Sequence, residues 1–187
     1  MARLPKSLTL GDGELVLRDW HERDAPAIES VCGDWNVCQF TTVPWEYTLD
    51  GARAWIRRQQ ERRSTGTGLA LAITNPDEPD PVGNVNLVRF TDNGDEAALG
   101  YWLVPAARGH GRAVRAAQLL CNWGFSEFGL QRIELAILPD NRASHAVARR
   151  LGAVPEGLRQ DSHAAGGQLL EMMIYSLPNP GRQHQGV

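Results

Sequence analysis

The most informative segment of this chain is Gly100-Tyr-Trp-Leu-Val-Pro-Ala-Ala-Arg-Gly-His-Gly-Arg-Ala113. An apolar strand leads into a short turn, and Gly109 and Gly111 stand where a helix is predicted to begin. The free N–H groups of a first helical turn, together with the helix dipole, attract anions. Two glycines keep side chains off that backbone, and Arg108 and Arg112 add positive charge. We therefore predict a pyrophosphate-binding turn; the alternative is a turn whose glycines serve backbone angles alone.

The rest of the chain alternates strands and helices around this turn. Hydrophobic periodicity predicts strands at residues 14–19, 69–74, 82–90, 97–103, 132–138, 157–162 and 169–177, and helices at residues 25–31, 48–63, 111–128 and 142–151. Asp24 and Thr48 are expected to cap the first two helices, and the acidic, proline-rich residues 75–81 to form a turn. This order predicts one domain of the α/β or α+β class, a mixed sheet flanked by helices. It would span residues 14–177, between an N-terminal extension (1–13) and a flexible C-terminal tail (178–187).

Composition narrows the function classes. The 187 residues carry 19 Lys and Arg against 22 Asp and Glu, a formal charge of −3, which gives no general attraction to nucleic acid or anionic lipid. The three cysteines show no paired spacing, so we expect neither a disulfide framework nor a metal site. With no signal-like N-terminus and no apolar run of about 18 residues, no membrane association is expected and a cytoplasmic location is predicted.

A second motif follows the glycine turn. Asn141-Arg-Ala-Ser144 begins a helix that ends Arg149-Arg-Leu-Gly-Ala153, and Glu156-Gly-Leu-Arg159 opens the next strand. Together with Arg108-Gly-His-Gly-Arg-Ala113, which matches the pattern Gln/Arg-x-x-Gly-x-Gly/Ala, this set resembles the GNAT acetyltransferase superfamily. It is most similar to the branch that contains the ribosomal-protein acetyltransferases RimJ and RimL. The resemblance covers about residues 14–177.

The resemblance implies a mostly antiparallel sheet whose central strands splay to form an acyl-CoA cleft. It assigns acetyl-CoA, the acyl donor, to Tyr101, Trp102, Leu103, Arg108, Gly109, His110, Gly111, Arg112, Ala113, Asn141 and Ser144. The backbone N–H near Leu103 would stabilise the oxyanion, and Ser144 would stabilise the departing thiolate. For Trp102 and Leu103 the alternative is plain sheet core, and for Asn141 and Ser144 it is helix capping.

The sequence departs from the family pattern at three positions. Val104 stands where an aspartate is frequent, Ala98 where an acid is common, and Ala148 where many members place a tyrosine acid. The RimL branch has a serine instead, which Ser144 matches. Because a serine hydroxyl is a far weaker acid than a thiol of pKa ~8.5, hydrogen bonding to the thiolate is its expected role.

No strong general base is evident from the sequence. Asp161, His163 and Glu156 lie near a strand that should border the cleft, and His163 is a weak candidate or an exposed turn residue. A missing base favours an α-amino group, such as a protein or peptide N-terminus, or a small amine of similarly low pKa, over lysine as the acceptor. The leading hypothesis is an acetyl-CoA-dependent N-acetyltransferase that acts on a primary amine without a metal. A larger donor such as succinyl-CoA, or a non-catalytic acyl-CoA-binding module, stays open, as does a homodimer. The aromatic loop from Trp35 to Tyr47 would shape the acceptor end.

Overall fold

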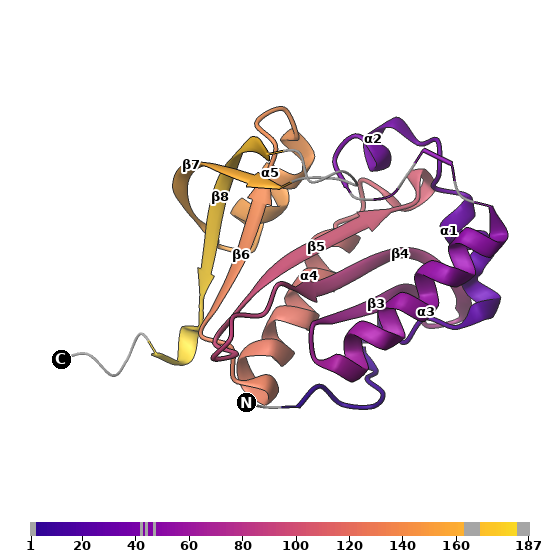
Figure 1. Cartoon of the computed structure of the whole chain (residues 1–187), viewed down its shortest axis with the longest axis horizontal. Coiled ribbons are helices and arrows are strands. Elements are labelled where there is room, and N and C mark those ends of the chain that lie inside the picture. Colours follow the sequence, from indigo (N-terminus) through magenta and orange to yellow (C-terminus); the bar gives the residue numbers. More distant parts are fainter. Residues whose placement is uncertain (1–2, 42, 44, 47, 163–168, 183–187) are drawn as a thin grey trace.

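The computed structural model describes residues 3–41, 43, 45–46, 48–162 and 169–182. Within these ranges, eight strands form one sheet in the order β1-β2-β3-β4-β5-β6-β8-β7, with helices on both faces (Figure 1). All neighbouring strands are antiparallel except β5 and β6, which are parallel. The predicted class, a mixed and mostly antiparallel sheet flanked by helices, is confirmed.

The elements follow the predicted order. The strands are β1 (Leu10–Gly11), β2 (Val16–Arg18), β3 (Gly68–Asn75), β4 (Glu78–Val88), β5 (Glu96–Leu103), β6 (Arg132–Ile137), β7 (Val154–Ser162) and β8 (Leu169–Pro178). The α-helices are α1 (Ala25–Glu29), α2 (Trp35–Cys38), α3 (Leu49–Thr65), α4 (Arg112–Trp123) and α5 (Arg142–Arg150). Three short 3₁₀ turns, η1 (Glu22–Asp24), η2 (Pro105–Ala107) and η4 (Pro180–Arg182), and a π-helical turn, η3 (Gly124–Phe128), complete the described chain.

The strand β3 shows how the two faces of the sheet differ. Its sequence alternates large and small residues, and since successive side chains point to opposite faces, each size collects on one face. Leu69, Leu71 and Ile73 enter the core that α4 covers. Ala70 and Ala72 lie in the smaller core beneath α3, beside Trp20 and Trp102. The face beneath α3 therefore has a floor of small residues.

The central strands β5 and β6 pair over one short segment and then separate. Glu96, Ala97 and Ala98 of β5 pair with Arg132, Ile133 and Glu134 of β6. Both strands continue beyond this segment, but no further residues of β5 and β6 pair with each other in the described part of the chain. Figure 1 shows the two strands diverging. The halves β1–β5 and β6–β8 thus enclose a V-shaped gap.

Three local expectations were wrong or incomplete. Residues 75–81 are not a single turn, because β4 begins at Glu78 and the strand includes Pro79 and Pro81. The loop around residues 33–47 contains the short helix α2. Asp24 precedes α1 but its carboxylate does not cap that helix; it accepts hydrogen bonds from Arg18 at 2.7 and 3.0 Å and from the backbone N–H of His21 at 2.8 Å.

Both ends of the described chain are tied to the domain. Leu10 and Gly11 of the predicted N-terminal extension pair with β2, and Leu4 is buried in the core. At the other end, the Asn179 side chain donates to the carbonyl of Leu130 at 2.8 Å, so the predicted flexible tail is anchored at its start. Residues 183–187 lie outside the described ranges.

Candidate active site

The gap between β5 and β6 exposes backbone groups of β5. In an antiparallel ladder, opposed residues alternate between hydrogen-bonded and non-hydrogen-bonded pairs. The Val104 N–H donates to the carbonyl of Val82 at 2.9 Å, so the next pair, Leu103 with Gly83, is non-hydrogen-bonded. By the same alternation the N–H and C=O groups of Tyr101 and Leu103 point away from β4 into the gap. The predicted position of the oxyanion donor therefore has an N–H that β4 does not use.

The glycine turn at the start of α4 has the backbone that the sequence predicts. Gly109 and Gly111 adopt left-handed φ angles of 85° and 73°, which residues with a Cβ avoid. Nothing lies within 4 Å of where a Cβ would stand at either position, so the space in front of the turn is open. Among the described residues no side chain caps the helix at Gly111. The first-turn N–H groups of α4 thus remain available to an anion.

Arg108 is engaged within the fold, which changes its expected role. Its Nε and Nη2 donate to the carbonyl of Leu103 at 3.1 and 3.0 Å, and Nη2 also pairs with Asp34 Oδ1 at 3.0 Å. Asp34 in turn caps α2 by accepting from the Val37 N–H at 3.0 Å. Arg108 therefore ties α2 to the end of β5, where we had expected a direct contact with pyrophosphate.

The other charged residues of the turn are less restrained. Arg112 makes one long hydrogen bond, from Nη1 to the carbonyl of Ala107 at 3.4 Å, and is partly exposed. His110 is exposed on the turn, and Ala113 is partly buried in the first turn of α4. Of the two arginines of the turn, Arg112 is thus the less engaged within the fold.

The start of α5 brings Asn141 and Ser144 to the gap. Asn141 is the N-cap residue, and its Oδ1 accepts from the Ser144 N–H at 3.1 Å, which confirms the capping expectation for Asn141. Ser144 is not a cap, so its hydroxyl is not committed to the helix end. The Tyr101 hydroxyl donates to the Ser144 carbonyl at 3.5 Å, which places Ser144 beside β5. Burial raises the pKa of Tyr101 to about 12, so this hydroxyl stays protonated near neutral pH.

The position at which many family members place a tyrosine acid is occupied by a buried alanine in this chain. Ala148 has no exposed surface and packs in the core between α5 and the sheet. His145, on the same helix, is held by Tyr175 and by the carbonyl of Pro139 at 3.0 and 3.1 Å. Ser144 is thus the polar side chain that α5 offers to the gap.

A cleft of about 700 Å³ occupies the gap and continues under α3. Its walls come from α3, the loop after α2, β4, β5, β6, β8 and the start of α5, and include Tyr101, Trp102, Asn141, Ser144, Phe40, Val43, Trp55, Arg62, Asn84, Asn86, Gly100 and Met172. The Trp102 side chain itself is sheet core, 7% exposed, with its ring centroid 6.0 Å from that of Trp20. Sequence reasoning missed the β4 and α3 residues because no local motif marks them.

The candidate bases near the cleft are bound to arginines. Arg89 pairs with Asp161 at 2.7 Å, and Arg159 bridges Asp161 and Glu134. A hydrogen bond from Ser176, and then the Arg132 guanidinium at 2.7 Å, lower the pKa of Glu156. Glu156 is therefore a weak proton acceptor, and Asp161 is held by two arginines. His163 lies outside the described residues.

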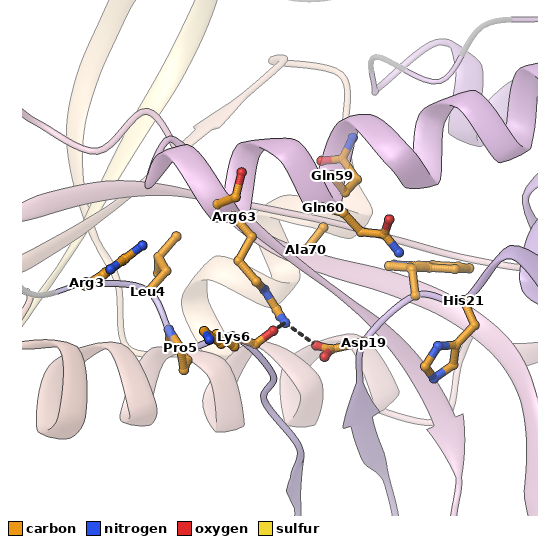
Figure 2. Close-up of a pocket in the computed structure, with 12 residues that line it drawn as sticks. Arg3, Leu4, Pro5, Lys6, Asp19, His21, Gln59, Gln60, Arg63 and Ala70 are labelled. Carbon is orange, nitrogen blue, oxygen red and sulfur yellow. Dashed lines mark hydrogen bonds and ion pairs between the residues drawn. The ribbon is translucent and has the colours of Figure 1, made fainter.

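A second pocket of about 450 Å³ lies between α3, the N-terminal segment and the end of β2 (Figure 2). Arg63 reaches from α3 into it and pairs with Asp19 at 2.6 Å, and it also donates to the carbonyl of Lys6. The Arg63 side chain is only 12% exposed. The pocket shares Gln59 with the cleft but contains none of the predicted site residues Tyr101, Asn141 and Ser144, which line the cleft, so the candidate site is the cleft.

Comparison with known proteins identifies the family. A model described as an acetyltransferase (GNAT) domain matches residues 14–154. The chain belongs to the GNAT acetyltransferase family. A similar protein is the uncharacterised N-acetyltransferase p20 of Bacillus licheniformis, 26% identical over 90% of this chain and 95% of that protein. The chain is therefore an acetyltransferase.

Solved GNAT structures share the fold. Mycobacterium smegmatis RimJ in complex with CoA-disulfide superposes with a TM-score of 0.81 at 22% identity, over 94% of this chain and 88% of that one. The ribosomal α-N-protein acetyltransferase RimL in complex with coenzyme A superposes with a TM-score of 0.80 at 20% identity, over 91% and 98%. The predicted likeness to RimJ and RimL is confirmed.

Two further properties concern the described residues only. None of their helices combines the length and the apolarity that crossing a membrane requires. No group of three or more His, Cys, Asp or Glu side chains is gathered there in a way that suits a metal ion.

Proposed function

We propose that this GNAT protein transfers the acetyl group of acetyl-CoA to an α-amino group by direct attack in a ternary complex. The observation that carries the proposal is the gap between β5 and β6. It leads from the uncapped glycine turn, past the backbone groups of Tyr101 and the N–H of Leu103, which β4 does not use, into a cleft open under α3. The neighbouring structures with bound coenzyme A support the same donor.

The donor would lie along β5 with its pyrophosphate at the first turn of α4. The N–H groups of that turn and Arg112 would bind the phosphates. The backbone N–H and C=O groups that face the gap would pair with the pantetheine amides as a further strand would. This arrangement presents the thioester to the cleft beside Ser144.

The chemistry then needs few side chains. The neutral amine attacks the thioester carbon, and the oxyanion that forms accepts a hydrogen bond from the backbone N–H of Leu103. The carbon–sulfur bond breaks, and the Ser144 hydroxyl donates a hydrogen bond to the thiolate. The amine loses its proton to water, since Asp161 and Glu156 are paired with arginines.

The weak bases favour an acceptor of low pKa. An α-amino group has a pKa of ~8, so about a tenth of it is neutral at pH 7. A lysine with a pKa of ~10.4 is neutral to less than about one part in a thousand. The difference of ~2.5 units is equivalent to about 3.4 kcal/mol that the enzyme must supply before lysine can react.

The test is a competition between two peptides with acetyl-CoA as donor. One peptide has a free N-terminus and no lysine, and the other is blocked at its N-terminus and carries one lysine. We expect acetylation of the free N-terminus to dominate at pH 7, with the preference decreasing as pH rises toward 10. Preferential acetylation of the blocked peptide would refute the proposed acceptor.

A further inference from the structure

The cleft floor contains an amide group whose hydrogen-bonding capacity is not used. Asn86 lies on β4 and lines the cleft, and its Oδ1 is buried without a hydrogen-bond partner. Its Nδ2 makes no hydrogen bond to another described residue either. Buried polar atoms in folded proteins nearly always have a partner, so an unpaired amide in the wall of a cleft calls for an explanation, and a bound ligand is one.

The neighbours of Asn86 place its amide oxygen over Gly100. Asn86 stands between Ala70 of β3 and Gly100 of β5 in the same row across the sheet. A Cβ at Gly100 would lie within contact of the amide oxygen, so a larger residue there would displace the Asn86 side chain. The row thus consists of two small residues with one amide between them, and that amide lies at the wall of the cleft.

Asn84 shows that the free amide is not a general feature of this strand. It lies two residues earlier on the same face and also lines the cleft. Its Oδ1 accepts from the Trp20 indole N–H at 3.1 Å, and the residue is 2% exposed. Asn84 is therefore a structural residue, whereas Asn86 has nothing in the fold to bind.

The position of Asn86 relates it to the reacting atoms. Gly100, its partner on β5, precedes Tyr101, whose hydroxyl reaches the Ser144 carbonyl. Adjacent strands are about 4.8 Å apart, so Asn86 lies within one or two strand spacings of the place where the thioester would meet the acceptor. Tyr101 belongs to the face of the sheet that α4 covers, and Asn86 points to the face beneath α3.

We propose that Asn86 binds the first peptide unit of the acceptor, and so selects an α-amino group that is followed by an amide. This inference rests on the proposed function. An asparagine side chain offers one acceptor oxygen and an NH₂ donor, which match the N–H and C=O of a peptide unit. With the peptide unit held under α3, the amine one carbon away is directed at the gap from the side opposite the donor.

The test couples a change in the protein to a change in the acceptor. Alanine amide and alanine methyl ester have the same amine, but the ester lacks the amide N–H. For wild type we expect kcat/KM to favour the amide by about five- to tenfold, after correction for the neutral fraction of each amine. Asn86→Ala should reduce this ratio to about one while leaving the dissociation constant of acetyl-CoA within about twofold.

Two further variants make the result specific. Gly100→Ala would displace the Asn86 side chain from the neighbouring strand and should also abolish the preference for the amide acceptor. This variant tests the proposal even if Asn86→Ala does not fold. Asn84→Ala, the matched control, should lower the melting temperature but keep the preference.

The outcomes separate the two proposals. If wild type acetylates neither acceptor, the proposed function fails and this inference fails with it. If wild type is active and Asn86→Ala loses rate equally on both acceptors, or raises the KM for acetyl-CoA alone, only the role of Asn86 is overturned.

Discussion

The proposed donor half and the proposed acceptor half of the site are built in different ways. The donor half consists mainly of backbone: the free edge of β5, two left-handed glycines and the first turns of α4 and α5. The acceptor half consists of side chains from α3, β4, β6 and β8, held in part by ion pairs that cross the gap, such as Arg89 with Asp161. A backbone site depends on a short contiguous motif, whereas a side-chain site depends on residues that only the fold brings together.

The largest effect is expected from a substitution in the glycine turn itself. Gly111→Glu forces a residue with a Cβ into a φ of 73° and places a carboxylate where the pyrophosphate would bind. We expect the dissociation constant of acetyl-CoA to rise at least about 100-fold, equivalent to about 2.7 kcal/mol, as measured by calorimetry. The matched control is Gly111→Asn, which tolerates the left-handed conformation without a charge and should weaken binding much less. Unchanged affinity in a folded Gly111→Glu protein would remove the turn from the donor site.

The second largest effect is expected at Ser144, whose side chain lies between the two halves. Ser144→Ala should lower kcat about tenfold or more while the KM for acetyl-CoA changes less than about threefold, because the hydroxyl acts on the thiolate and not on the bound donor. The control Asn141→Ala removes the cap of α5 and should cost about 1 kcal/mol of stability. A loss of kcat within about threefold would mean that Ser144 only occupies the first turn of α5.

A third experiment distinguishes binding from support at the glycine turn. If Arg108 acts by holding α2 and the end of β5, Arg108→Ala and Asp34→Ala should each destabilise the fold, with a coupling of about 0.5–1 kcal/mol in a double-mutant cycle. The affinity for acetyl-CoA should then change less than about threefold. A tenfold loss of affinity in Arg108→Ala, with Asp34→Ala unaffected, would restore the direct phosphate contact that the sequence suggested.

The difference between a site built from backbone and one built from side chains also explains which parts of the site the sequence could predict. The turn from Arg108 to Ala113 combines glycines, charge and a strand-to-helix boundary within a few residues, so local chemistry was enough to place it. The partner of Arg108 was not foreseeable, because Asp34 is distant in the sequence and its contact depends on how α2 packs. Asn86 escaped notice for a related reason: an asparagine in a strand is unremarkable until Gly100 and Ala70 are known to flank it.

The smallest effect concerns the ion pair between Arg132 and Glu156, which lies outside the lining of the cleft. A hydrogen bond from Ser176 and the Arg132 guanidinium lower the pKa of Glu156 in the folded chain. A carboxyl whose folded pKa lies below its unfolded value, about 4.3, adds stability above that value and loses it as pH falls through the folded pKa. Glu156→Gln should therefore reduce the free energy of unfolding at pH 7 and match wild type at pH 3.

The size of that difference follows from exposure. The Arg132 and Glu156 side chains are 24% and 43% exposed, so solvent screens the pair and the difference at pH 7 should stay below about 1 kcal/mol. Urea denaturation at pH 7, 5 and 3 measures it, and the exposed Glu127→Gln is the control that should match wild type throughout. A difference that grows as the solution is acidified would show that Glu156 is better solvated in the unfolded chain. In that case the pair between Arg132 and Glu156 would orient these two side chains without stabilising the fold.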